Sequence, residues 1–463
     1  MSAGYSLHPT ILREYDIRGI VGETLSADDV GAIGAAFATR LVAAGGASVA
    51  VGYDGRQSSP ELEAALVAGL VGCGLHVIRV GVGPTPMLYF AAATLPTDGG
   101  VMITGSHNPP EYNGIKMTLK GKPFFGDDIR SLAKIAAAGD TATGEGRTEE
   151  VDLRDAYADR LAKEYKASRA LRVGWDPGNG AAAEVLNRLL TRIAGHHHVI
   201  NGVIDGSFPN HHPDPTVLAN LQQLQTLVAD EGCELGIAFD GDGDRIGVVD
   251  AQGRVLHADQ LMLILAADVL AERPGAPIIA DVKSSQVLFD ETARLGGRPV
   301  MWKTGHSLIR AKMIEMGAPM AGEMSGHIFF ADRYYGFDDA LYAAVRLLAI
   351  IDCTGTSLAE YRDRMPAILN TPELRFPCAE ARKFEVIEEV RARLSDAGAE
   401  VNDIDGVRVL SGDGWWLLRA SNTQDVLVAR CEAASEAGLA ALKGEVAAQL
   451  RASGLEPPAD LTS

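Results

Sequence analysis

The chain has 463 residues, of which 47% are apolar, and a formal net charge of -19. Its length is several times the roughly 100 to 150 residues of a common domain, so three or four domains are expected. The negative field of the whole chain excludes general binding to nucleic acid or anionic lipid, and a phosphate ligand would need a local cationic pocket.

A strand, a turn and an amphipathic helix open three successive parts of the chain. This pattern occurs at 47–74, 171–195 and 277–297. Each copy later reaches a strand, a polar loop and a second apolar run, at 100–119, 235–250 and 318–330. We therefore expect three similar α/β domains with mixed sheets. Because such sheets carry their working loops at the carboxyl ends of strands, the three polar loops should converge on one central cleft.

The last part of the chain has another order of elements. Two prolines near 366 to 372 interrupt the helix and strand patterns, and a strand, a helix at 381–398, a hairpin at 406–433 and a final helix follow. This order predicts an α+β domain behind a hinge. Further helices are expected at 152–167, 258–272 and 337–355. The predicted domains are 1–151, 152–254, 255–366 and 367–463.

The second polar loop, DGDGDR at 240–245, favours a metal site. Glycines alternate with Asp240, Asp242 and Asp244 and let the backbone fold three carboxylates toward one point, and hard oxygen ligands suit magnesium or calcium. An EF-hand is excluded, because Arg245 and Ala251 stand where its glycine and glutamate are required. An acidic surface turn is the simpler alternative, but three aspartates between two apolar strands favour the metal.

The first polar loop puts a serine beside a histidine in a turn-forming run. Taken alone, Ser106 would be a turn hydroxyl and His107 a hydrogen-bonded structural residue. A metal site in the next domain changes this interpretation. A hydroxyl can carry a phosphoryl group, a divalent ion can neutralise its oxygens, and Lys116 can serve proton transfer or charge balance. Together these residues predict a phosphoryl-transfer site.

Four segments resemble the signature loops of the α-D-phosphohexomutases, in that family's order and one on each predicted domain: TGSHNPPEYNGIK, DGDGDRIGVVD, GEMSGHIFF and RASNTQDVLVAR. The resemblance covers essentially the whole chain. Three further segments are similar to the bacterial phosphomannomutase/phosphoglucomutase branch: EYDIRG at 14–19, KTGHS at 303–307 and GEMSGH at 322–327. The resemblance implies an isomerase that moves a phosphoryl group reversibly between C1 and C6 of mannose and glucose phosphates.

The resemblance also implies how the residues would act. Ser106 would be a phosphoserine, and glucose 1,6-bisphosphate would be both intermediate and activator. An oxygen of the phosphate on Ser106 would bind Mg²⁺ together with Asp240, Asp242 and Asp244. The groups around the transferring phosphoryl would be Arg18, His107, Lys116 and Arg245. Among them, Lys116 is the candidate general base or acid.

The third and fourth loops would bind the substrate. In the domain 255–366, Glu323 and Ser325 would accept and donate to sugar hydroxyls. The same pocket would be lined by Lys283, His306 and His327. The phosphate that does not react would be held by Tyr15, Arg419, Ser421, Asn422 and Thr423. The partners implied are small hexose phosphates, and the chain would be a monomer or a weak oligomer.

Other functions stay open. A phosphoglucosamine mutase has the same loops but usually carries Gln where Met324 stands. A phosphatase would discharge phospho-Ser106 to water, although it would have no use for a second phosphate clamp. A binding protein without catalysis would not need Ser106 together with three metal-site aspartates.

The fourth loop, RASNTQDVLVAR, departs from relatives at Gln424 and Asp425, and this departure should make its turn less rigid.

The remaining cysteine, histidine and tryptophan groups are expected to be structural. The five cysteines are odd in number and far apart, so they should be reduced core residues: Cys73, Cys233, Cys353, Cys378 and Cys431. Adjacent histidines on an extended chain point to opposite faces, which argues against zinc at 196–198 or 211–212. Of Trp415 and Trp416, one ring should enter the core.

No membrane attachment is expected. No apolar run reaches the roughly 18 residues of a membrane span, and the first residues lack the charged and then apolar build of a secretory signal. The sequence therefore predicts a cytoplasmic protein.

Overall fold

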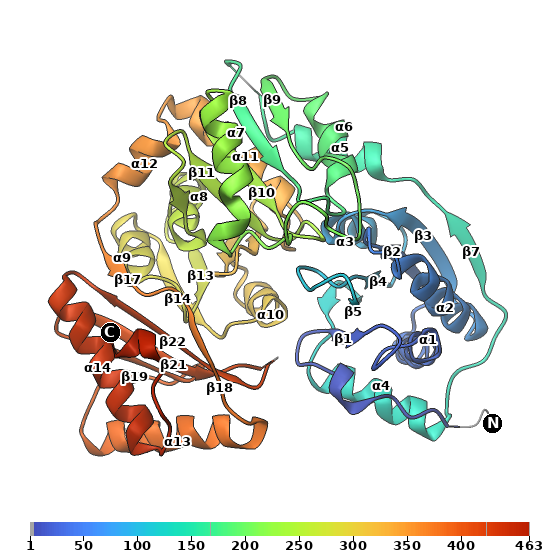
Figure 1. Cartoon of the computed structure of the whole chain (residues 1–463). Coiled ribbons are helices and arrows are strands. Elements are labelled where there is room, and N and C mark those ends of the chain that lie inside the picture. Colours follow the sequence, from blue (N-terminus) through green and yellow to red (C-terminus); the bar gives the residue numbers. More distant parts are fainter. Residues whose placement is uncertain (1–3, 167, 423, 463) are drawn as a thin grey trace.

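The computed structural model describes residues 4–166, 168–422 and 424–462. Its elements form four units, each with its own β-sheet, and the units follow one another in an arc (Figure 1). The first three have mixed sheets with helices, and the sheet of the fourth is antiparallel. This confirms the predicted fold class of three α/β units and a C-terminal α+β unit.

The first unit is built on a seven-stranded sheet with the order β1-β5-β4-β2-β3-β7, and β6 pairs with β5. Its strands are β1 (Ile17–Ile20), β2 (Ser48–Tyr53), β3 (His76–Val82), β4 (Gly99–Ile103), β5 (Tyr112–Leu119), β6 (Lys122–Pro123) and β7 (Arg147–Glu150). Its helices are α1 (Ala27–Ala43), α2 (Ser59–Gly72), α3 (Thr85–Thr94) and α4 (Asp127–Ala138). The central strand β2 is rich in valine and buried along its middle, as expected for a strand with both faces covered.

The second unit has a five-stranded sheet with the order β12-β11-β10-β8-β9. Its strands are β8 (Arg172–Asp176), β9 (His196–Val199), β10 (Leu235–Phe239), β11 (Ile246–Asp250) and β12 (Val255–Leu256). Its helices are α5 (Arg154–Ala162), α6 (Ala183–Leu190) and α7 (Gln222–Asp230). A short 3-10 helix, Leu218–Leu221, precedes α7.

The third unit has a four-stranded sheet with the order β14-β13-β15-β16. Its strands are β13 (Pro277–Asp281), β14 (Arg298–Trp302), β15 (Met320–Gly322) and β16 (Ile328–Phe330). Its helices are α8 (Ala258–Glu272), α9 (Gln286–Arg294), α10 (His306–Met316), α11 (Ala340–Thr354) and α12 (Leu358–Arg364).

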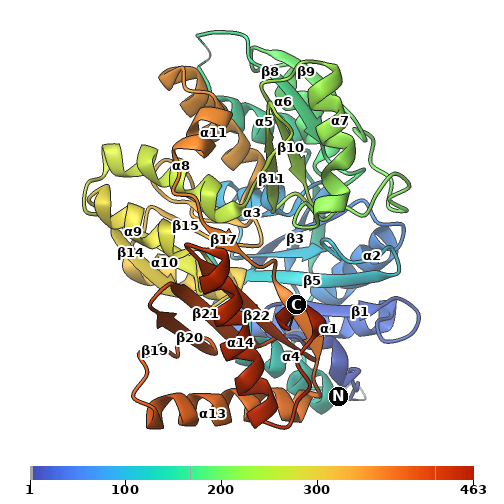
Figure 2. The same cartoon turned by 60° about the vertical axis from the view of Figure 1, so that its left-hand side comes forward.

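The fourth unit has a six-stranded sheet with the order β17-β22-β21-β20-β19, and β18 also pairs with β22. Its strands are β17 (Leu369–Asn370), β18 (Leu374–Pro377), β19 (Val401–Asn402), β20 (Val407–Ser411), β21 (Gly414–Ala420) and β22 (Val426–Ala433). Its helices are α13 (Glu380–Asp396) and α14 (Glu436–Ala452). Both helices lie along the same side of this sheet (Figure 2).

The same strand pairing recurs in the first three units. A central strand runs parallel to the first strand of an antiparallel pair: β2 beside β4–β5, β8 beside β10–β11, and β13 beside β15–β16. Each polar loop predicted to be functional connects the two strands of such a pair. The repeat read from the sequence is therefore a repeat of topology, and it puts the three loops at equivalent positions.

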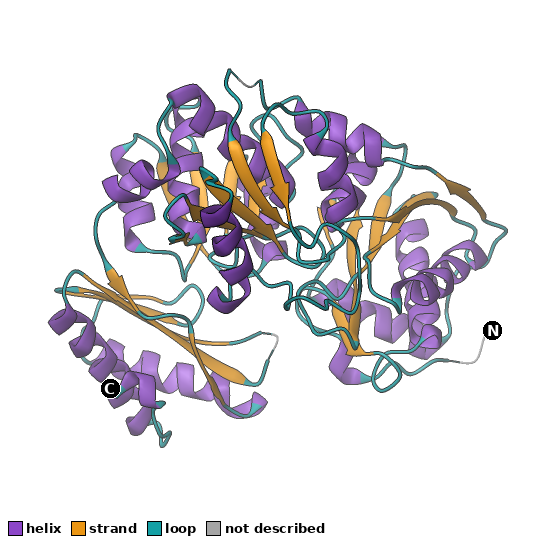
Figure 3. Ribbon diagram, turned by 45° about the horizontal axis from the view of Figure 1, so that its top comes forward, coloured by secondary structure: helices purple, strands orange, loops and turns teal. Residues whose placement is uncertain are grey.

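One large apolar cluster joins the first three units, while the fourth unit has a core of its own and shares only a small cluster with the third. One continuous cluster contains Phe90 of α3, Trp175 of β8 and Tyr342 of α11. The fourth unit has its own cluster, which includes Val390 and Trp416. The view from above shows the sheet and helices of the fourth unit standing beside the rest of the chain (Figure 3). A separate core is what a domain able to move as a body requires.

Two sequence expectations need correction. Both Trp415 and Trp416 are buried, because strand β21 faces the fourth unit's helices on one side and Val282 of the third unit on the other. Four cysteines are buried, but Cys353 is exposed, since it lies near the end of α11 where the helix leaves the core.

Among the described residues, no single helix is long and apolar enough to cross a membrane. Helices α11 and α12 reach the length and apolar composition of a membrane span only when taken together, and the chain bends by 86° between them.

Candidate active site

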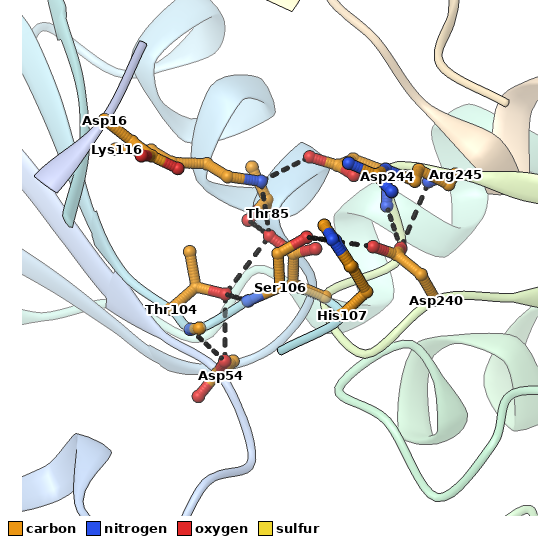
Figure 4. A network of polar contacts seen from close by, with 12 residues as sticks. Asp16, Asp54, Thr85, Thr104, Ser106, His107, Lys116, Asp240, Asp244 and Arg245 are labelled. Carbon is orange, nitrogen blue, oxygen red and sulfur yellow. Dashed lines mark hydrogen bonds and ion pairs between the residues drawn. The ribbon is translucent and has the colours of Figure 1, made fainter. Parts of the chain in front are cut away.

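Ser106 lies in the turn that follows β4, and its backbone adopts a left-handed conformation with φ of 50°. The side chain is buried. Its Oγ donates to Asp240 Oδ2 at 3.0 Å and lies 3.2 Å from His107 Nδ1. The N–H of Ser106 donates to Thr104 Oγ1 at 2.9 Å. The hydroxyl of the first unit thus points at the acidic loop of the second (Figure 4).

The acidic loop between β10 and β11 brings three buried carboxylates together. Oxygens of Asp240, Asp242 and Asp244 lie within 4.8 Å of one another. Asp240 Oδ1 accepts the N–H groups of Asp244 and Arg245, both at 3.1 Å, and Asp242 Oδ2 accepts the Thr85 hydroxyl at 2.5 Å. Among the described residues, Asp242 Oδ1 and Asp244 Oδ1 have no hydrogen-bond partner. Buried carboxylate oxygens with open lone pairs fit a hard divalent cation.

Lys116, on β5, supplies the positive charge nearest to these carboxylates. Its Nζ donates to Asp242 Oδ2 at 2.7 Å and to Asp244 Oδ2 at 2.5 Å, and the side chain is 4% exposed. Burial by itself lowers the pKa of Lys116, but Asp242 and Asp244 outweigh it and raise that pKa well above its ordinary value. In this arrangement Lys116 is an ammonium ion that balances the acidic loop.

Two further groups beside Ser106 complete its polar surroundings. Burial lowers the pKa of His107 well below its ordinary value, and the charges of Arg245 and Arg18 lower it further, so the imidazole is neutral. Arg18, on β1, binds Asp16 at 2.5 Å through Nη2, while its buried Nε has no hydrogen-bond partner within the described part of the chain. A guanidinium with an unused donor suits an anionic group.

The third polar loop touches the second directly. Arg245 Nε donates to His327 Nε2 at 3.0 Å, and the two residues form an isolated β-bridge. The other ring nitrogen, Nδ1, lies 2.9 Å from Asp338 Oδ2 and 3.4 Å from Asp244 Oδ1. Burial lowers the pKa of His327, but Asp244 and Asp338 outweigh it and raise that pKa above its ordinary value. The His306 ring stacks on His327 with centroids 5.4 Å apart.

Glu323 and Ser325 form the polar part of the third loop. Glu323 is buried, accepts the N–H of Gly305 at Oε1 and accepts the Ser325 hydroxyl at Oε2 over 3.2 Å. Burial raises the pKa of Glu323, with the charge of Asp281 acting in the same direction. Each oxygen of the side chain accepts one of these hydrogen bonds and keeps a lone pair that a hydroxyl-rich ligand could use.

The fourth loop is joined to the others through Tyr15. Asn422 Nδ2 donates to the Tyr15 hydroxyl at 2.6 Å, and that hydroxyl donates to the carbonyl of Thr304 at 2.7 Å. Arg419, at the end of β21, binds Asp405 Oδ2 at 3.1 Å, and Asp405 also accepts the N–H of Thr304 at 3.0 Å. First, third and fourth units thus meet in one polar chain.

Ser421 and its neighbours form a closed turn. Ser421 Oγ accepts the N–H of Gln424 at 3.2 Å, and the Gln424 side chain accepts from Arg375 at 3.2 Å. The carbonyl of Asp425 accepts the N–H of Cys378 at 2.9 Å. Thr423 lies outside the described residues. The expectation that Gln424 and Asp425 loosen the turn stays a prediction.

Strands of the fourth unit hold the turn that carries Lys283. Arg408 Nη1 donates to the carbonyls of Val282 at 2.6 Å and Ser284 at 2.7 Å, and Arg430 donates to the carbonyl of Lys283 itself. The Lys283 ammonium pairs with Glu373 at 2.9 Å. Lys283 therefore belongs to the seam between the third and fourth units.

The sequence prediction missed the residues that hold the predicted ones in place. They are Asp16, Asp54, Thr85, Thr104, Asp281, Thr304, Asp338, Glu373 and Asp405. One signal was available. Asp54 follows β2 and Asp281 ends β13, so both occupy the same place in the repeat, and each accepts an N–H from the functional loop of its unit: Gly105 at 3.0 Å and Met324 at 3.1 Å.

Four family models match this chain in order. They are described as phosphoglucomutase/phosphomannomutase alpha/beta/alpha domains I, II and III, at 9–143, 155–253 and 257–368, and as the C-terminal domain of the same proteins, at 373–449.

Known proteins are similar to this chain over nearly their whole length. A phosphomannomutase/phosphoglucomutase of Pseudomonas aeruginosa is 43% identical over 447 residues, which is 96% of each chain. The crystal structure of a phosphoglucomutase/phosphomannomutase family protein of Burkholderia thailandensis is 43% identical, with a TM-score of 0.92 over 97% of this chain and 98% of that one. An N-acetylphosphoglucosamine mutase of Aspergillus fumigatus, crystallised with GlcNAc-6P and magnesium, shares the fold at 14% identity, with a TM-score of 0.61 over 97% of both chains.

Proposed function

Since this chain belongs to the phosphoglucomutase/phosphomannomutase family of the α-D-phosphohexomutase superfamily, we propose that it works through a phosphoserine at Ser106. The protein is an isomerase that interconverts hexose 1-phosphates and hexose 6-phosphates. One observation carries the proposal. The buried Ser106 Oγ faces Asp240 at 3.0 Å, beside two carboxylate oxygens that have no hydrogen-bond partner in the described chain and beside the Lys116 ammonium.

The reaction has two balanced halves. In the first, a hydroxyl oxygen of the hexose phosphate attacks the phosphorus of phospho-Ser106. The bond from phosphorus to Oγ breaks as the new phosphorus–oxygen bond forms, and the hydroxyl proton ends on Oγ. The products are free serine and a hexose 1,6-bisphosphate. In the second half Oγ attacks the phosphorus of the other phosphate, the bond from that phosphorus to the sugar oxygen breaks, and the Oγ proton passes to the sugar oxygen, which restores phospho-Ser106. We propose that the Lys116 ammonium serves both halves: it donates a proton to the departing oxygen and takes up the proton of the attacking hydroxyl, so that its charge is the same before and after each half.

The acidic loop supplies the place for a cation. Asp240, Asp242 and Asp244, with an oxygen of the Ser106 phosphate, would hold Mg²⁺, which withdraws negative charge from the phosphoryl group during transfer. The open oxygens of Asp242 and Asp244 support this assignment, as does the magnesium in the crystals of the fungal mutase. Arg18, His107 and Arg245 would hold the remaining phosphoryl oxygens.

The third and fourth loops would bind the two ends of the sugar phosphate. Glu323 and Ser325 would orient hydroxyls of the ring, and the same pocket would include Lys283, His306 and His327. The other phosphate would be held by Tyr15, Arg419, Ser421, Asn422 and Thr423. Because one hexose must present each end to a single serine, the bisphosphate must turn without escaping. Movement of the fourth unit about 366–372 would permit this.

Replacement of the serine tests the proposal. The Ser106→Ala variant should fold normally, since the hydroxyl makes few contacts, but its kcat for conversion of glucose 1-phosphate to glucose 6-phosphate should fall by about a thousandfold or more. Ser131→Ala, on helix α4 of the same unit, is the matched control and should keep wild-type activity. Near-normal turnover by Ser106→Ala would reject the phosphoserine.

Substrate choice needs a second measurement. Mannose, glucose and glucosamine phosphates should be compared with and without a trace of glucose 1,6-bisphosphate. A mutase of the proposed kind is activated by the bisphosphate and releases little inorganic phosphate. A preference for glucosamine phosphate would favour the phosphoglucosamine mutase alternative, and steady release of inorganic phosphate would favour a phosphatase.

A further inference from the structure

Behind the Ser106 loop lies a buried arginine that the reaction described above does not use. Arg56 follows β2 and precedes α2, and it is 1% exposed. Its guanidinium does not contact the Ser106 hydroxyl. It contacts the backbone of the loop instead. A buried charged group that serves no ligand needs another explanation, because removing it from water is costly.

All five N–H groups of this guanidinium are used. Nε donates to Asp54 Oδ2 at 3.2 Å. The other four donate to carbonyl oxygens of the Ser106 loop: Nη2 to Ser106 at 2.7 Å and Asn108 at 2.6 Å, and Nη1 to Pro109 at 2.6 Å and Tyr112 at 3.0 Å. Arginine is the side chain that can do this, since it has five donors in a fixed planar fork. One side chain therefore fixes the turn from residue 106 to residue 112.

The turn needs such support at Ser106. A residue other than glycine at φ of 50° has a strained backbone, which the surrounding contacts must stabilise. The Ser106 carbonyl accepts from the guanidinium and also lies close to the acidic loop: a Cβ added at Gly241 would stand 2.4 Å from the carbonyl oxygen. A Cβ at Gly105 would stand 2.4 Å from Arg56 Cζ. The backbone thus has little room to shift in either direction.

The repeat of the chain gives an independent comparison. Arg56 stands two residues after Asp54, as Lys283 stands two residues after Asp281 in the third unit. Both aspartates accept an N–H from the functional loop of their unit. The two cations have different partners, since the Lys283 ammonium pairs with Glu373 at the seam, whereas Arg56 is turned onto its own loop. In the first unit the repeated position therefore supports the loop.

We propose that Arg56 is a positioning residue for phosphoryl transfer: it holds the Ser106 turn in the left-handed conformation that aims Oγ at the acidic loop. This inference rests on the proposed phosphoserine. A small displacement of a reacting atom costs about 100-fold in rate when the other groups stay in place. The contacts of Tyr15, Glu323 and Arg419 do not involve Arg56, so substrate binding should be little affected.

The Arg56→Lys variant tests the role directly. Lysine keeps the charge and most of the stem, but its three donors radiate from one atom and cannot serve four carbonyls. For conversion of glucose 1-phosphate to glucose 6-phosphate, kcat should fall about 100-fold with KM within about twofold of wild type. Arg79→Lys is the matched control: Arg79 lies on β3 of the same unit and pairs with Glu63 at 2.7 Å. Its kcat should not change.

Chemical rescue separates positioning from folding. Added guanidinium ion at millimolar concentration should restore part of the kcat of Arg56→Ala, whereas methylammonium at equal ionic strength should not. If Arg56→Ala does not fold, the kcat of folded Arg56→Lys decides. Wild-type kcat in Arg56→Lys, or an equal loss in Arg79→Lys, would overturn the inference. Labelling with radioactive glucose 1,6-bisphosphate tests the premise separately, because absence of label on wild-type Ser106 would reject the phosphoserine itself.

Discussion

Replacing Tyr157 with phenylalanine should destabilise the protein in a pH-dependent way. Tyr157 lies on α5 and donates to Asp339 Oδ2 of the third unit at 2.8 Å. Tyr334 donates to the same oxygen at 2.7 Å, and the N–H of Tyr342 donates to Oδ1 at 2.9 Å. Asp339 is the N-cap of α11 and is 1% exposed. The variant removes one of three donors from a buried carboxylate between two units.

The pH dependence of this loss of stability follows from the titration of Asp339. Burial raises its pKa from 3.8 to about 7, against the opposing effect of the three hydrogen bonds. This difference between the folded and unfolded pKa corresponds to about 4 kcal/mol of folding free energy. Because the folded pKa is raised, this contribution is complete below pH 3.8 and is lost as the pH rises to about 7. Above that pH the folded protein holds a buried anion that depends on its donors.

Phenylalanine at position 157 therefore costs more when Asp339 is ionised. A hydrogen bond to a charged group contributes about 1.5 to 3 kcal/mol, and one between neutral groups about 1 kcal/mol. For large domains, of roughly 150 to 250 residues, each kcal/mol of lost stability lowers Tm by about 2 to 4 °C. The expected fall in Tm is about 2 to 4 °C near pH 5.5 and about twice that near pH 8.5.

Thermal unfolding followed by circular dichroism at both pH values measures this difference. Tyr165→Phe is the matched control, because Tyr165 is also buried but its hydroxyl has no hydrogen-bond partner among the described residues. That variant should show a small change that is equal at both pH values. An equal fall in Tm at the two pH values for Tyr157→Phe would refute the reasoning, as would an equal effect of Tyr165→Phe.

Two other predictions concern the cation and the seam. Excess chelator should abolish conversion of glucose 1-phosphate to glucose 6-phosphate and added Mg²⁺ should restore it, because Asp242 and Asp244 offer open oxygens in the described structure; full activity in chelator would remove the acidic loop from the mechanism. Burial raises the pKa of Glu373, but Lys283 and Arg375 outweigh it and hold that pKa well below 4.5. The stability that this carboxylate supplies is therefore present above pH 4.5 and lost as the pH falls below it. The Tm of wild type should fall more steeply on acidification below that value than the Tm of Glu373→Gln, and parallel curves would contradict the assignment.

The sequence was sufficient to predict the three α/β units and the polar loops that join their strand pairs. A strand-forming run, a turn and an amphipathic helix in succession mark β2, β8 and β13 without any knowledge of their neighbours. Ser106 and Asp242 could be found for the same reason, since each lies in a polar loop between two apolar strands. Such signals depend only on residues that are neighbours in the chain, so one sequence is enough to detect them. The exact domain boundaries at 151, 254 and 366 stay predictions.

Residues that act through distant contacts could not be found in this way. Tyr15 meets Asn422 across 407 positions of the chain, and Arg56 meets Ser106 across 50. Nothing in the residues around Arg56 indicates that four of its five donors will be used by the turn between β4 and β5. The burial of Trp415 likewise depends on which unit packs against which, since its ring meets Val282 of the third unit. Packing between units arises only when the sheets are assembled, so the hydrophobic pattern of a single strand or helix does not predict it.

The bonds from Arg408 and Arg430 to the carbonyls of residues 282 to 284 limit how the last unit can turn. A rotation that keeps these bonds must have its axis close to that turn, since points near an axis travel least. Lys283 would then remain almost stationary, while Asn422 at the tip of the neighbouring strand swept the wider arc. A rotation about any distant axis would first have to break a row of buried hydrogen bonds, each of which resists it.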